Sequence, residues 1–334
     1  MEKKTTGKVG AILLVGGFGT RLHPLTLETP KPFLSVAGVP FIDHQIYQAI
    51  GAGVSEIVLA TSFKSEIFTP YCGDGSRYGT TIKYAVEKTA LGTGGAIRNA
   101  AKLLSEDIED VVIFNGDVLS GFNLSNEIAF HQEKDAWATL YLTTVADARP
   151  FGVVELNLDS SIKSFNEKME NPPTNVINAG CYLFNRALID HIEDSFSDDV
   201  VVSVEREIFP QLLIEKKPVF GFVDSSYWLD MGTPENFRKA SSDLVMGVAH
   251  SPATPPVTGE AIISPGCIVD TSAQLLAGTT IGANSQVGKG CVITGSIIGE
   301  NVVVGNNVQV INSIVNKNTE IPAGTIIIDG IFGF

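Results

Sequence analysis

The chain has 334 residues, enough for two domains, and 44% of them are hydrophobic, which is ample for a core. Its formal net charge of −14 argues against binding to nucleic acid, which requires a basic face. No apolar run reaches the length of a membrane span, and the N-terminal residues lack the apolar segment of a signal peptide, so we expect a cytoplasmic protein without membrane association.

Strand-like and helix-like segments alternate over about the first 237 residues. The expected strands cover residues 9–15, 56–60, 81–86, 111–114 and 138–145. The expected helices cover residues 41–49, 64–71, 95–104 and 124–132. This alternation predicts βαβ units and a mainly parallel sheet, in an α/β domain over residues 1–240. Ligands of such sheets bind at the carboxyl ends of the strands.

A glycine-rich loop follows the first expected strand. It contains Gly16, Gly17, Gly19, Thr20 and Arg21, and Lys31 follows between two prolines. Glycines allow a sharp turn whose backbone amides form a concave anion site. The loop lacks the Gly-Lys-Ser/Thr of a P-loop and the spacing of the dinucleotide fingerprint. The glycines alone suit an ordinary turn equally well, whereas Arg21 and Lys31 favour binding of a polyphosphate.

Two aspartates are candidates for a magnesium site. Asp117, in Asn-Gly-Asp at residues 115–117, follows the strand expected at 111–114. Asp230 comes just before Thr233, which is placed to cap a helix that begins at Pro234. Magnesium prefers a few carboxylates together with phosphates and water. The alternative reading of Asp117 is an Asn-Gly turn with a capping aspartate.

Two further stretches carry groups that suit substrates. Residues 91–98 form a second glycine-rich loop that opens a helix, and its N-terminus suits the base or ribose of a nucleotide. The alternative is a helix start with flexible glycines. Glu167 and Lys168 follow another expected strand, and they suit sugar hydroxyls and a phosphate. The alternative there is a charged strand end at the surface.

The pattern changes after residue 240. Residues 241–258 contain Pro-Ala-Thr-Pro-Pro and are predicted to be a linker. Over residues 259–334, aliphatic side chains recur every six residues with two five-residue steps, at Ile263, Val269, Leu275, Ile281, Val287, Ile293, Ile298, Val304, Val310, Val315, Ile321 and Ile327. This hexapeptide repeat predicts a parallel β-helix of roughly four triangular coils whose core these side chains fill.

The histidines and cysteines show no metal-ligand spacing. The four cysteines are expected to be free thiols in a reducing compartment. None of the five histidines lies in the repeat region, so the histidine-based acyl transfer of many β-helix enzymes is not expected there. A structural or assembly role suits the repeats better.

The long motif Gly-Gly-Phe-Gly-Thr-Arg-Leu-His-Pro-Leu-Thr at residues 16–26, followed by Pro-Lys-Pro at 30–32, resembles the signature of the sugar-nucleotide pyrophosphorylases. The resemblance extends over nearly the whole chain. It implies a Rossmann-like nucleotidyltransferase domain followed by a left-handed β-helix. It also implies a Mg²⁺-dependent enzyme that joins a sugar 1-phosphate to a nucleoside triphosphate and releases pyrophosphate.

The resemblance implies a role for each candidate residue. Arg21, Lys31 and Lys168 are the implied catalytic cations, which neutralise the departing pyrophosphate, the triphosphate and the sugar phosphate, respectively. The implied nucleotide-binding residues are Gly16, Gly17, Gly19, Thr20, Glu87, Gly92, Thr93 and Asn115. The implied sugar-binding residues are Gly152, Glu167, Asn178 and Gly180. Asp117 and Asp230 are the implied Mg²⁺ ligands. The chain departs from the family's Glu-Lys-Pro at Met169, which loosens the local backbone restraint.

Within this family the segment Ser-Val-Glu-Arg-Glu-Ile-Phe-Pro at residues 203–210, with Leu-Gly-Thr-Gly-Gly at 91–95, is most similar to mannose-1-phosphate guanylyltransferases. That similarity implies GTP and mannose 1-phosphate as substrates. Glucose-1-phosphate thymidylyl-, uridylyl- or adenylyltransferases remain the alternative. A non-catalytic sugar-nucleotide-binding regulator remains a third reading. The sparsely charged repeats suggest a homo-oligomer formed through the β-helix.

Overall fold

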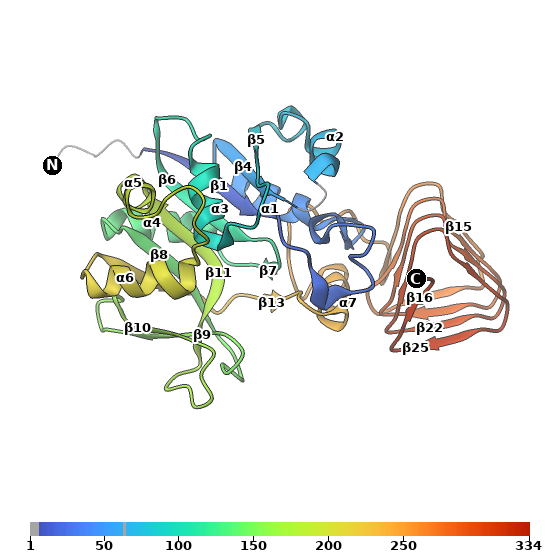
Figure 1. Cartoon of the computed structure of the whole chain (residues 1–334). Coiled ribbons are helices and arrows are strands. Elements are labelled where there is room, and N and C mark those ends of the chain that lie inside the picture. Colours follow the sequence, from blue (N-terminus) through green and yellow to red (C-terminus); the bar gives the residue numbers. More distant parts are fainter. Residues whose placement is uncertain (1–6, 63–64) are drawn as a thin grey trace. The chain divides into compact units, whose positions relative to one another are not determined.

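The structure is a computed structural model that describes residues 7–62 and 65–334 (Figure 1). The chain divides into two compact units. The first comprises Met1–Gly17, Gln45–Val118 and Phe122–Trp228, and the second comprises Phe18–His44, Leu119–Gly121 and Leu229–Phe334. Among the described residues no helix combines the length and apolar character needed to cross a membrane.

The first unit is built on a nine-stranded mixed sheet (Figure 1). Its parallel part has the order β6-β1-β4-β5, formed by Ile108–Asn115, Lys8–Leu14, Glu56–Thr61 and Thr81–Val86. Its antiparallel part joins at β6 and contains β11 (Val176–Asn185), β9 (Gly152–Leu156) and β10 (Ile162–Glu167). β8 (Ala138–Thr144) pairs with β11 and, in parallel, with β12 (Val219–Val223). The predicted α/β class is confirmed.

The helices of this unit follow the predicted order with shifted ends. They are α1 (Phe41–Gly51), whose first four residues belong to the second unit, α3 (Gly92–Ala101) and α4 (Leu124–Glu133), followed by α5 (Arg186–Ser195), the π-helix η5 (Val204–Ile208) and α6 (Phe209–Ile214). The helix predicted at 64–71 is two short pieces, η3 (Ser65–Ile67) and α2 (Phe68–Cys72), and residue 64 lies outside the described residues. The helix predicted at 95–104 begins earlier, at Gly92.

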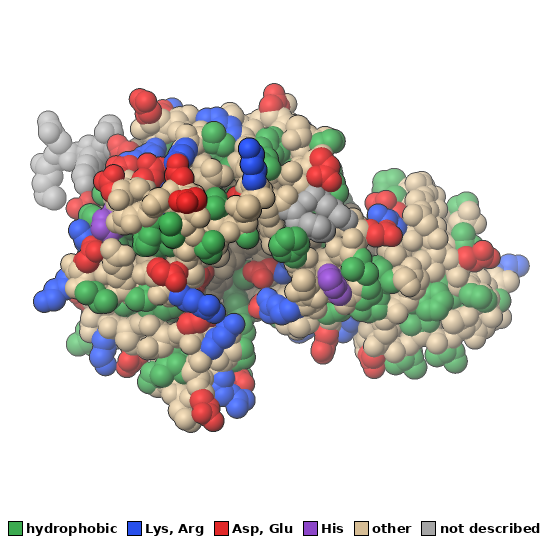
Figure 2. Space-filling model, viewed as in Figure 1, with side chains coloured by type: hydrophobic (Ala, Val, Ile, Leu, Met, Phe, Trp, Pro, Cys, Tyr) green, Lys and Arg blue, Asp and Glu red, His purple; other side chains and the backbone are tan. Residues whose placement is uncertain are grey.

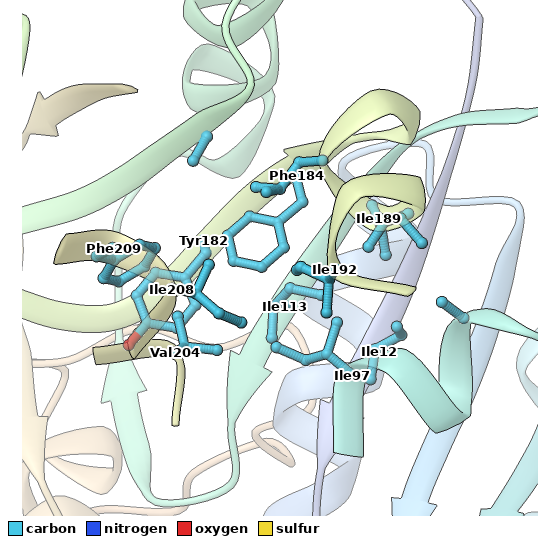
Figure 3. Close-up of a cluster of buried hydrophobic side chains, with 14 of the residues drawn as sticks. Ile12, Ile97, Ile113, Tyr182, Phe184, Ile189, Ile192, Val204, Ile208 and Phe209 are labelled. Carbon is cyan, nitrogen blue, oxygen red and sulfur yellow. The ribbon is translucent and has the colours of Figure 1, made fainter. Parts of the chain in front are cut away.

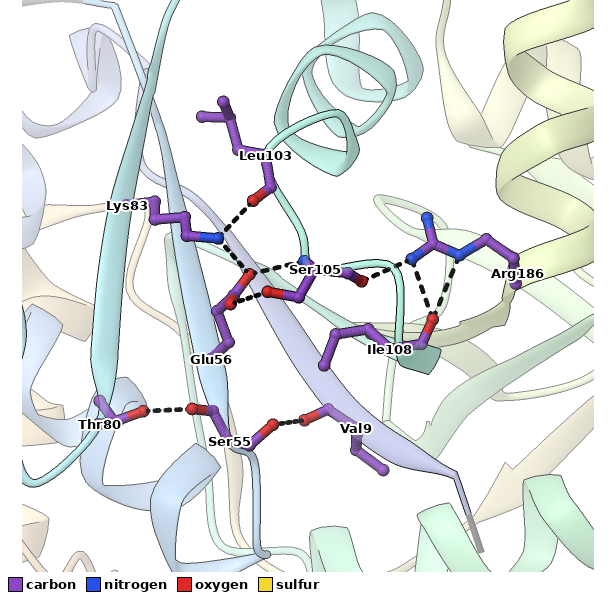
Figure 4. A network of polar contacts seen from close by, with 9 residues as sticks. All are labelled: Val9, Ser55, Glu56, Thr80, Lys83, Leu103, Ser105, Ile108 and Arg186. Atoms are coloured by element: carbon purple, nitrogen blue, oxygen red, sulfur yellow. Dashed lines mark hydrogen bonds and ion pairs between the residues drawn. The ribbon is translucent and has the colours of Figure 1, made fainter.

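A buried hydrophobic cluster packs α3, α5 and α6 against the sheet. Figure 3 shows Ile97 beside Ile12 and Ile113, and Tyr182 near Ile208 and Phe209. At the amino ends of the strands, the Glu56 carboxylate accepts hydrogen bonds from the Ser105 amide (3.0 Å) and hydroxyl (2.7 Å) and lies 3.1 Å from Lys83 Nζ (Figure 4). This polar network ties β4 and β5 to the start of β6 and leaves the opposite, carboxyl edge for a site.

The second unit contains α7 (Pro234–Val245), the short hairpin β2 (Ser35–Val36) and β3 (Val39–Pro40), and a parallel β-helix. Strands β14–β26 form three parallel sheets of five, four and four strands. The repeats match the expected left-handed β-helix of about four coils, since pairing partners such as Ile281 and Ile298 occupy the predicted positions. Gly282 allows close stacking, because a Cβ there would lie 2.5 Å from the Gly299 carbonyl carbon.

The prediction that every repeat aliphatic fills the core is wrong at the first position. Ile263 is 45% exposed, although it lies in register with Ile281, which is fully buried. Ile263 belongs to the first coil, so no preceding coil covers it. The later positions Val287, Ile293 and Val310 are buried as expected.

Candidate active site

Part of the glycine-rich loop continues from β1 in the first unit. The Val15 amide donates to the Ala60 carbonyl (3.0 Å), and the Ser62 hydroxyl donates to the Gly16 carbonyl (2.5 Å). A Cβ on Gly16 would lie 2.8 Å from Ser62 Oγ, so the close approach to the end of β4 favours glycine. A Cβ on Gly17 would meet nothing within 4 Å, which leaves its backbone open to a ligand.

The cationic part of the loop lies in the second unit. Gly19 has φ +63°, and its carbonyl accepts a hydrogen bond from the Thr26 hydroxyl (2.9 Å). Thr20 and Arg21 follow in a 3₁₀ turn, η1 (Thr20–Leu22). Lys31 begins another, η2 (Lys31–Phe33), and is buried, with its Cβ 3.5 Å from the position that a Gly19 Cβ would take. The structure therefore brings Gly19 and Lys31 together.

Asp230, also in the second unit, ends β13 (Trp228–Asp230) and lies near Arg21. Asp230 Oδ1 accepts the Gly232 amide (2.6 Å), and Oδ2 lies 3.7 Å from Arg21 Nη1. A Cβ at position 232 would lie 2.6 Å from the guanidinium carbon, so the absence of a side chain at Gly232 makes room for Arg21. The predicted cap of α7 is confirmed, because the Thr233 side chain accepts from the Asn236 amide (3.3 Å).

Asp117 lies in the first unit, in the turn between β6 and β7 (Val118–Ser120), and is half-buried. The turn requires Gly116, because a Cβ there would lie 2.4 Å from the Leu14 carbonyl oxygen. The neighbouring Asn115 ends β6, and its carbonyl accepts from the Gln45 side chain (2.8 Å). Across residues 7–62 and 65–334, no group of three or more His, Cys, Asp and Glu side chains could hold a metal by itself. Mg²⁺ that is also bound by phosphates and water does not need such a cluster of protein ligands.

The second glycine-rich loop lies at the carboxyl end of β5. The Glu87 amide donates to the Thr61 carbonyl (2.8 Å), and the Glu87 carboxylate accepts from the Leu91 amide (3.3 Å). Burial raises the pKa of Glu87 above its usual value, and the hydrogen bond from Leu91 opposes that shift. Gly92 has φ +74°, and a Cβ there would lie 2.5 Å from the Val202 carbonyl oxygen. The loop is therefore packed against residue 202.

The start of α3 was expected from the sequence to suit a nucleotide, but two backbone amides there are already hydrogen-bonded within the protein. The Gly94 and Gly95 amides both donate to the Val202 carbonyl, at 2.8 and 3.3 Å. The Thr93 hydroxyl donates to Glu205 (2.9 Å) and accepts from the Val204 amide (2.9 Å). The Gly94 and Gly95 amides therefore hold the loop in place and are not free helix-terminal donors for a nucleotide.

The four predicted sugar-side residues come together on β9, β10 and β11. Gly152 pairs with Glu167 across the antiparallel strands, and a Cβ on Gly152 would lie 3.0 Å from Glu167 Oε2 and 3.5 Å from Asn178 Cβ. Asn178 Oδ1 accepts from the Gly180 amide (3.2 Å), where φ is +81° and the pairing with β8 shifts register. We refer to Gly152, Glu167, Asn178 and Gly180, which bring a carboxylate and an amide close together, as the sugar corner.

Lys168 extends from this corner. Its backbone has φ +54° and its amide donates to the Phe151 carbonyl (3.1 Å). Its exposed ammonium group lies 4.0 Å from Glu167 Oε1. Burial raises the pKa of the Glu167 carboxyl, and the charge of Lys168 opposes that shift.

Comparison with known proteins identifies the family of the chain. A family described as nucleotidyl transferase matches residues 10–246, and one described as GlmU-like, C-terminal hexapeptide, matches residues 248–329. The chain belongs to the nucleotidyl transferase family.

Individual relatives give more detail about this nucleotidyl transferase. It is 46% identical over 286 residues to a mannose-1-phosphate guanylyltransferase of Mycobacterium tuberculosis. The match covers 85% of this chain and 78% of the relative. It is 32% identical over 285 residues to a mannose-1-phosphate guanyltransferase of Pichia angusta, covering 84% and 73%.

Among solved structures, HddC from Yersinia pseudotuberculosis has a TM-score of 0.59 and 27% identity, covering 70% of this chain and 99% of that one. A putative glucose-1-phosphate thymidylyltransferase from Bacillus anthracis has a TM-score of 0.64, covering 70% and 94%; at 22% identity it shows the fold alone.

Sequence reasoning missed three residues of this nucleotidyl transferase: two contact predicted residues directly, and Trp228 contacts Ala179, which lies between the predicted Asn178 and Gly180. Glu205 binds Thr93 (2.9 Å), Tyr182 binds Asn178 (2.8 Å), and the Trp228 indole donates to the Ala179 carbonyl (2.9 Å). In the sequence analysis, residues 203–210 were used only to infer the class of substrate, and none of them was named as a site residue. The available signal was Ser203, a residue type favoured as an N-cap, followed by the acidic Glu205 and Glu207, which suit the first turn of a helix.

Proposed function

We propose that this chain is a mannose-1-phosphate guanylyltransferase, which converts GTP and α-D-mannose 1-phosphate to GDP-mannose and diphosphate. The observation that carries the proposal is the 46% identity, over 85% of the chain, to a relative with that name. The corner formed by Gly152, Glu167 and Asn178 supports it, because a carboxylate and an amide are suited to sugar hydroxyls.

In the proposed reaction a phosphate oxygen of mannose 1-phosphate attacks the α-phosphorus of GTP. The new O–P bond forms as the bond between the α-phosphorus and its bridging oxygen breaks, and pyrophosphate leaves with that electron pair. The attacking phosphate is already anionic near neutral pH, so no strong general base is needed. Catalysis then depends on position and on neutralising charge.

The chain's own cations supply much of that charge. We assign Arg21 to the departing pyrophosphate, Lys31 to the triphosphate and Lys168 to the phosphate of the sugar substrate. The buried stem of Lys31 favours a fixed position, whereas Arg21 and Lys168 are exposed and can adjust to their phosphates. Removal of one such cation is expected to cost several kcal/mol of transition-state stabilisation.

The proposal includes Mg²⁺ held by Asp117 and Asp230. A bound Mg²⁺ would neutralise the triphosphate and polarise its phosphoryl oxygens. Gly16, Gly17, Gly19, Thr20, Glu87, Gly92, Thr93 and Asn115 are the proposed nucleotide-side residues. Gly152, Glu167, Asn178 and Gly180 are the proposed sugar-side residues.

Two other functions compete with this proposal. A glucose-1-phosphate thymidylyl-, uridylyl- or adenylyltransferase would use the same reaction with another base and sugar. A regulatory homologue would bind sugar nucleotides without turnover, and it would be expected to lack a loop cation or a metal aspartate. The chain retains Arg21, Lys31, Asp117 and Asp230, which favours an enzyme.

We also propose a catalytic domain over residues 1–240, a linker over 241–258 and a β-helix domain over 259–334, in a cytoplasmic homo-oligomer that binds neither nucleic acid nor membranes. On the face drawn in Figure 2, the β-helix carries hydrophobic side chains and few charged ones. Exposed Ile268 (66%), Ile326 (61%) and Ile328 (56%) support self-association through this domain.

The decisive test is pyrophosphate release by purified protein with Mg²⁺, four nucleoside triphosphates and several hexose 1-phosphates. Turnover should be fastest with GTP and mannose 1-phosphate. Faster turnover with another pair would support a different sugar nucleotidyltransferase. Binding of a sugar nucleotide without turnover of any pair would support the regulator.

A further inference from the structure

Glu205 lies at the centre of a hydrogen-bond network inside the first unit. Its Oε2 accepts from the hydroxyls of Thr93 (2.9 Å) and Ser203 (2.8 Å). Its Oε1 accepts from the hydroxyl of Tyr182 (3.1 Å). The Tyr182 oxygen in turn accepts from the Asn178 side-chain amide (2.8 Å). Glu205 therefore connects a residue of the nucleotide loop with a residue of the sugar corner.

The direction of every bond in this network follows from the carboxylate. The hydroxyls of Thr93 and Tyr182 both donate to the carboxylate oxygens of Glu205. Because the Tyr182 proton is used in that way, Asn178 must donate its amide N–H to the Tyr182 oxygen. Asn178 Oδ1 is then left to accept from the Gly180 amide, as observed at 3.2 Å. The Gly180 amide, which can only donate, and the Tyr182 oxygen therefore select the same orientation of Asn178, and Glu205 holds the second of these two partners.

Tyr182, the link between Glu205 and Asn178, is held firmly by the core. The Tyr182 ring packs at 5.2 Å from the Phe209 ring and at 6.0 Å from the Phe184 ring, and Figure 3 shows it in the buried cluster beside Val204. Burial raises the pKa of Tyr182 well above its usual value, so its hydroxyl keeps its proton. The ring cannot move without disturbing the core. Its hydroxyl therefore holds Glu205 and Asn178 in a fixed position relative to each other.

Glu205 itself lies in an uncommon local structure. It belongs to the π-helix η5, where the Ser203 side chain accepts from the Arg206 amide (3.3 Å) and Glu207 accepts from the Ser203 amide (2.5 Å). This is a capping box in which the acidic residue is four rather than three positions after the cap. The wider turn places Glu205 toward Thr93, and short π-helices are frequent at functional sites.

We propose that Glu205, acting through Tyr182, is a positioning residue that couples the nucleotide pocket to the sugar-phosphate pocket. The inference rests on the proposed function, because it takes Thr93 and Asn178 as residues of the two pockets. Ordering of Thr93 by a nucleotide fixes Glu205, which fixes Tyr182 and Asn178 for the sugar phosphate. Linkage makes the effect reciprocal, so each substrate tightens the binding of the other by the same factor.

The test measures that factor without turnover. A non-reactive α,β-methylene analogue of GTP is titrated calorimetrically, with Mg²⁺, in the absence and presence of mannose 1-phosphate. For the wild type we expect the sugar phosphate to tighten analogue binding by about fivefold or more, the lower end of common coupling factors. Glu205→Gln and Tyr182→Phe should reduce the factor to about twofold or less. Glutamine keeps the shape of Glu205 but presents a donor where the network needs an acceptor.

The matched control is Tyr141→Phe, which removes the hydroxyl of another fully buried tyrosine, on the adjacent strand β8, outside the network. It should retain the wild-type factor. Thr93→Val removes the hydroxyl that donates to Glu205, and it serves as a third network variant if either of the others folds poorly. Unchanged coupling in the network variants, equal loss in Tyr141→Phe, or no coupling in a wild type that does turn over would each overturn the inference. Failure of the wild type to turn over with any substrate pair would instead count against the proposed function.

Discussion

Asp117 and Asp230 are held by local turns rather than by the hydrophobic core. Asp117 occupies a turn that depends on Gly116, and Asp230 accepts the Gly232 amide two residues later. Neither aspartate is fully buried. At the residue scale, this means that the charge of Asp117 can be removed while its shape and the surrounding packing are kept.

We therefore predict that Asp117→Asn lowers turnover by about 100-fold or more, because a carboxylate ligand of the metal is lost, and shifts the melting temperature by less than about 2 °C. Pyrophosphate release and thermal unfolding measure the two effects. Asp107→Asn, at an exposed carboxylate paired with Lys8, is the control and should change neither. A large drop in melting temperature would mean that Asp117 is a structural cap.

Glu127 gives a prediction about pH. It is fully buried on α4, and neither carboxyl oxygen has a hydrogen-bond partner. Burial raises its pKa well above the usual value, and the nearby Tyr141 and Cys181 also have pKa values raised by burial. The native state therefore keeps a proton on Glu127 that the unfolded chain releases. This contribution to stability is complete below the unfolded pKa and is lost as the pH rises toward the folded pKa.

Glu127→Gln removes that titration. We compare the free energy of unfolding of the variant minus that of the wild type. This difference should increase by up to about 1.4 kcal/mol per pH unit between pH 5 and 8, and it should be smallest near pH 4. Urea unfolding at several pH values measures it. A difference that stays constant with pH would show that folding does not raise the pKa of Glu127.

At the scale of elements, helix α3 is held by a segment about a hundred residues away. The buried Arg98 guanidinium donates to the carbonyls of Phe196 (3.2 Å) and Asp198 (2.8 Å), with a longer contact to that of Val200 (3.5 Å). Val202 then bonds the first turn of the same helix. The nucleotide loop thus depends on the segment that leads into the π-helix.

We predict that Arg98→Met lowers the free energy of unfolding by about 2–4 kcal/mol, since it leaves carbonyl groups without partners, and raises the KM for the nucleotide. Lys102→Met is the control, because Lys102 is the exposed C-cap residue of the same helix and also contacts Asp198. Its effect should stay below about 1 kcal/mol. Denaturant unfolding and steady-state kinetics give both readouts, and equal effects of the two variants would contradict this role for Arg98.

At the scale of the whole molecule, the chain combines a sheet-based unit with a stacked one. In a stacked β-helix each coil contacts only its neighbours, so stability is roughly a sum over adjacent coils. The core of these coils contains Ile293, Val310 and Ile327 from one of the three sheets. Loss of volume in a middle coil weakens its contacts with both adjacent coils.

Accordingly, Ile293→Ala should lower the free energy of unfolding of the β-helix by about 2–5 kcal/mol, because it opens a cavity at a fully buried position. Ile326→Ala removes the same atoms from a side chain of the same sheet that is 61% exposed, and should cost less than about 1 kcal/mol. Thermal unfolding followed by circular dichroism compares the two. Similar destabilisation would mean that Ile326 is covered, for example by another subunit.

Predictions that depended on local rules agree closely with the structure. The strand expected at 81–86 is β5, the Thr233 cap is present, and the repeat aliphatics fall in the strands of the β-helix. The antiparallel strands β9 and β11 were not among the expected strands, because the expectation followed βαβ alternation and these strands lie outside that pattern. The candidate carboxylates and cations were found from motifs, but their contacts were not.

The sequence by itself determined the α/β class, the repeat register and the residue types of the candidate site, because periodicity and turn chemistry act within a few neighbouring residues. Only the tertiary structure decided that the Gly94 and Gly95 amides are bound to Val202 and that Glu205 connects Thr93 with Tyr182. Those contacts join segments more than twenty, and in part more than one hundred, residues apart. Which of the many polar groups meet across such distances is set by the packing of the whole unit.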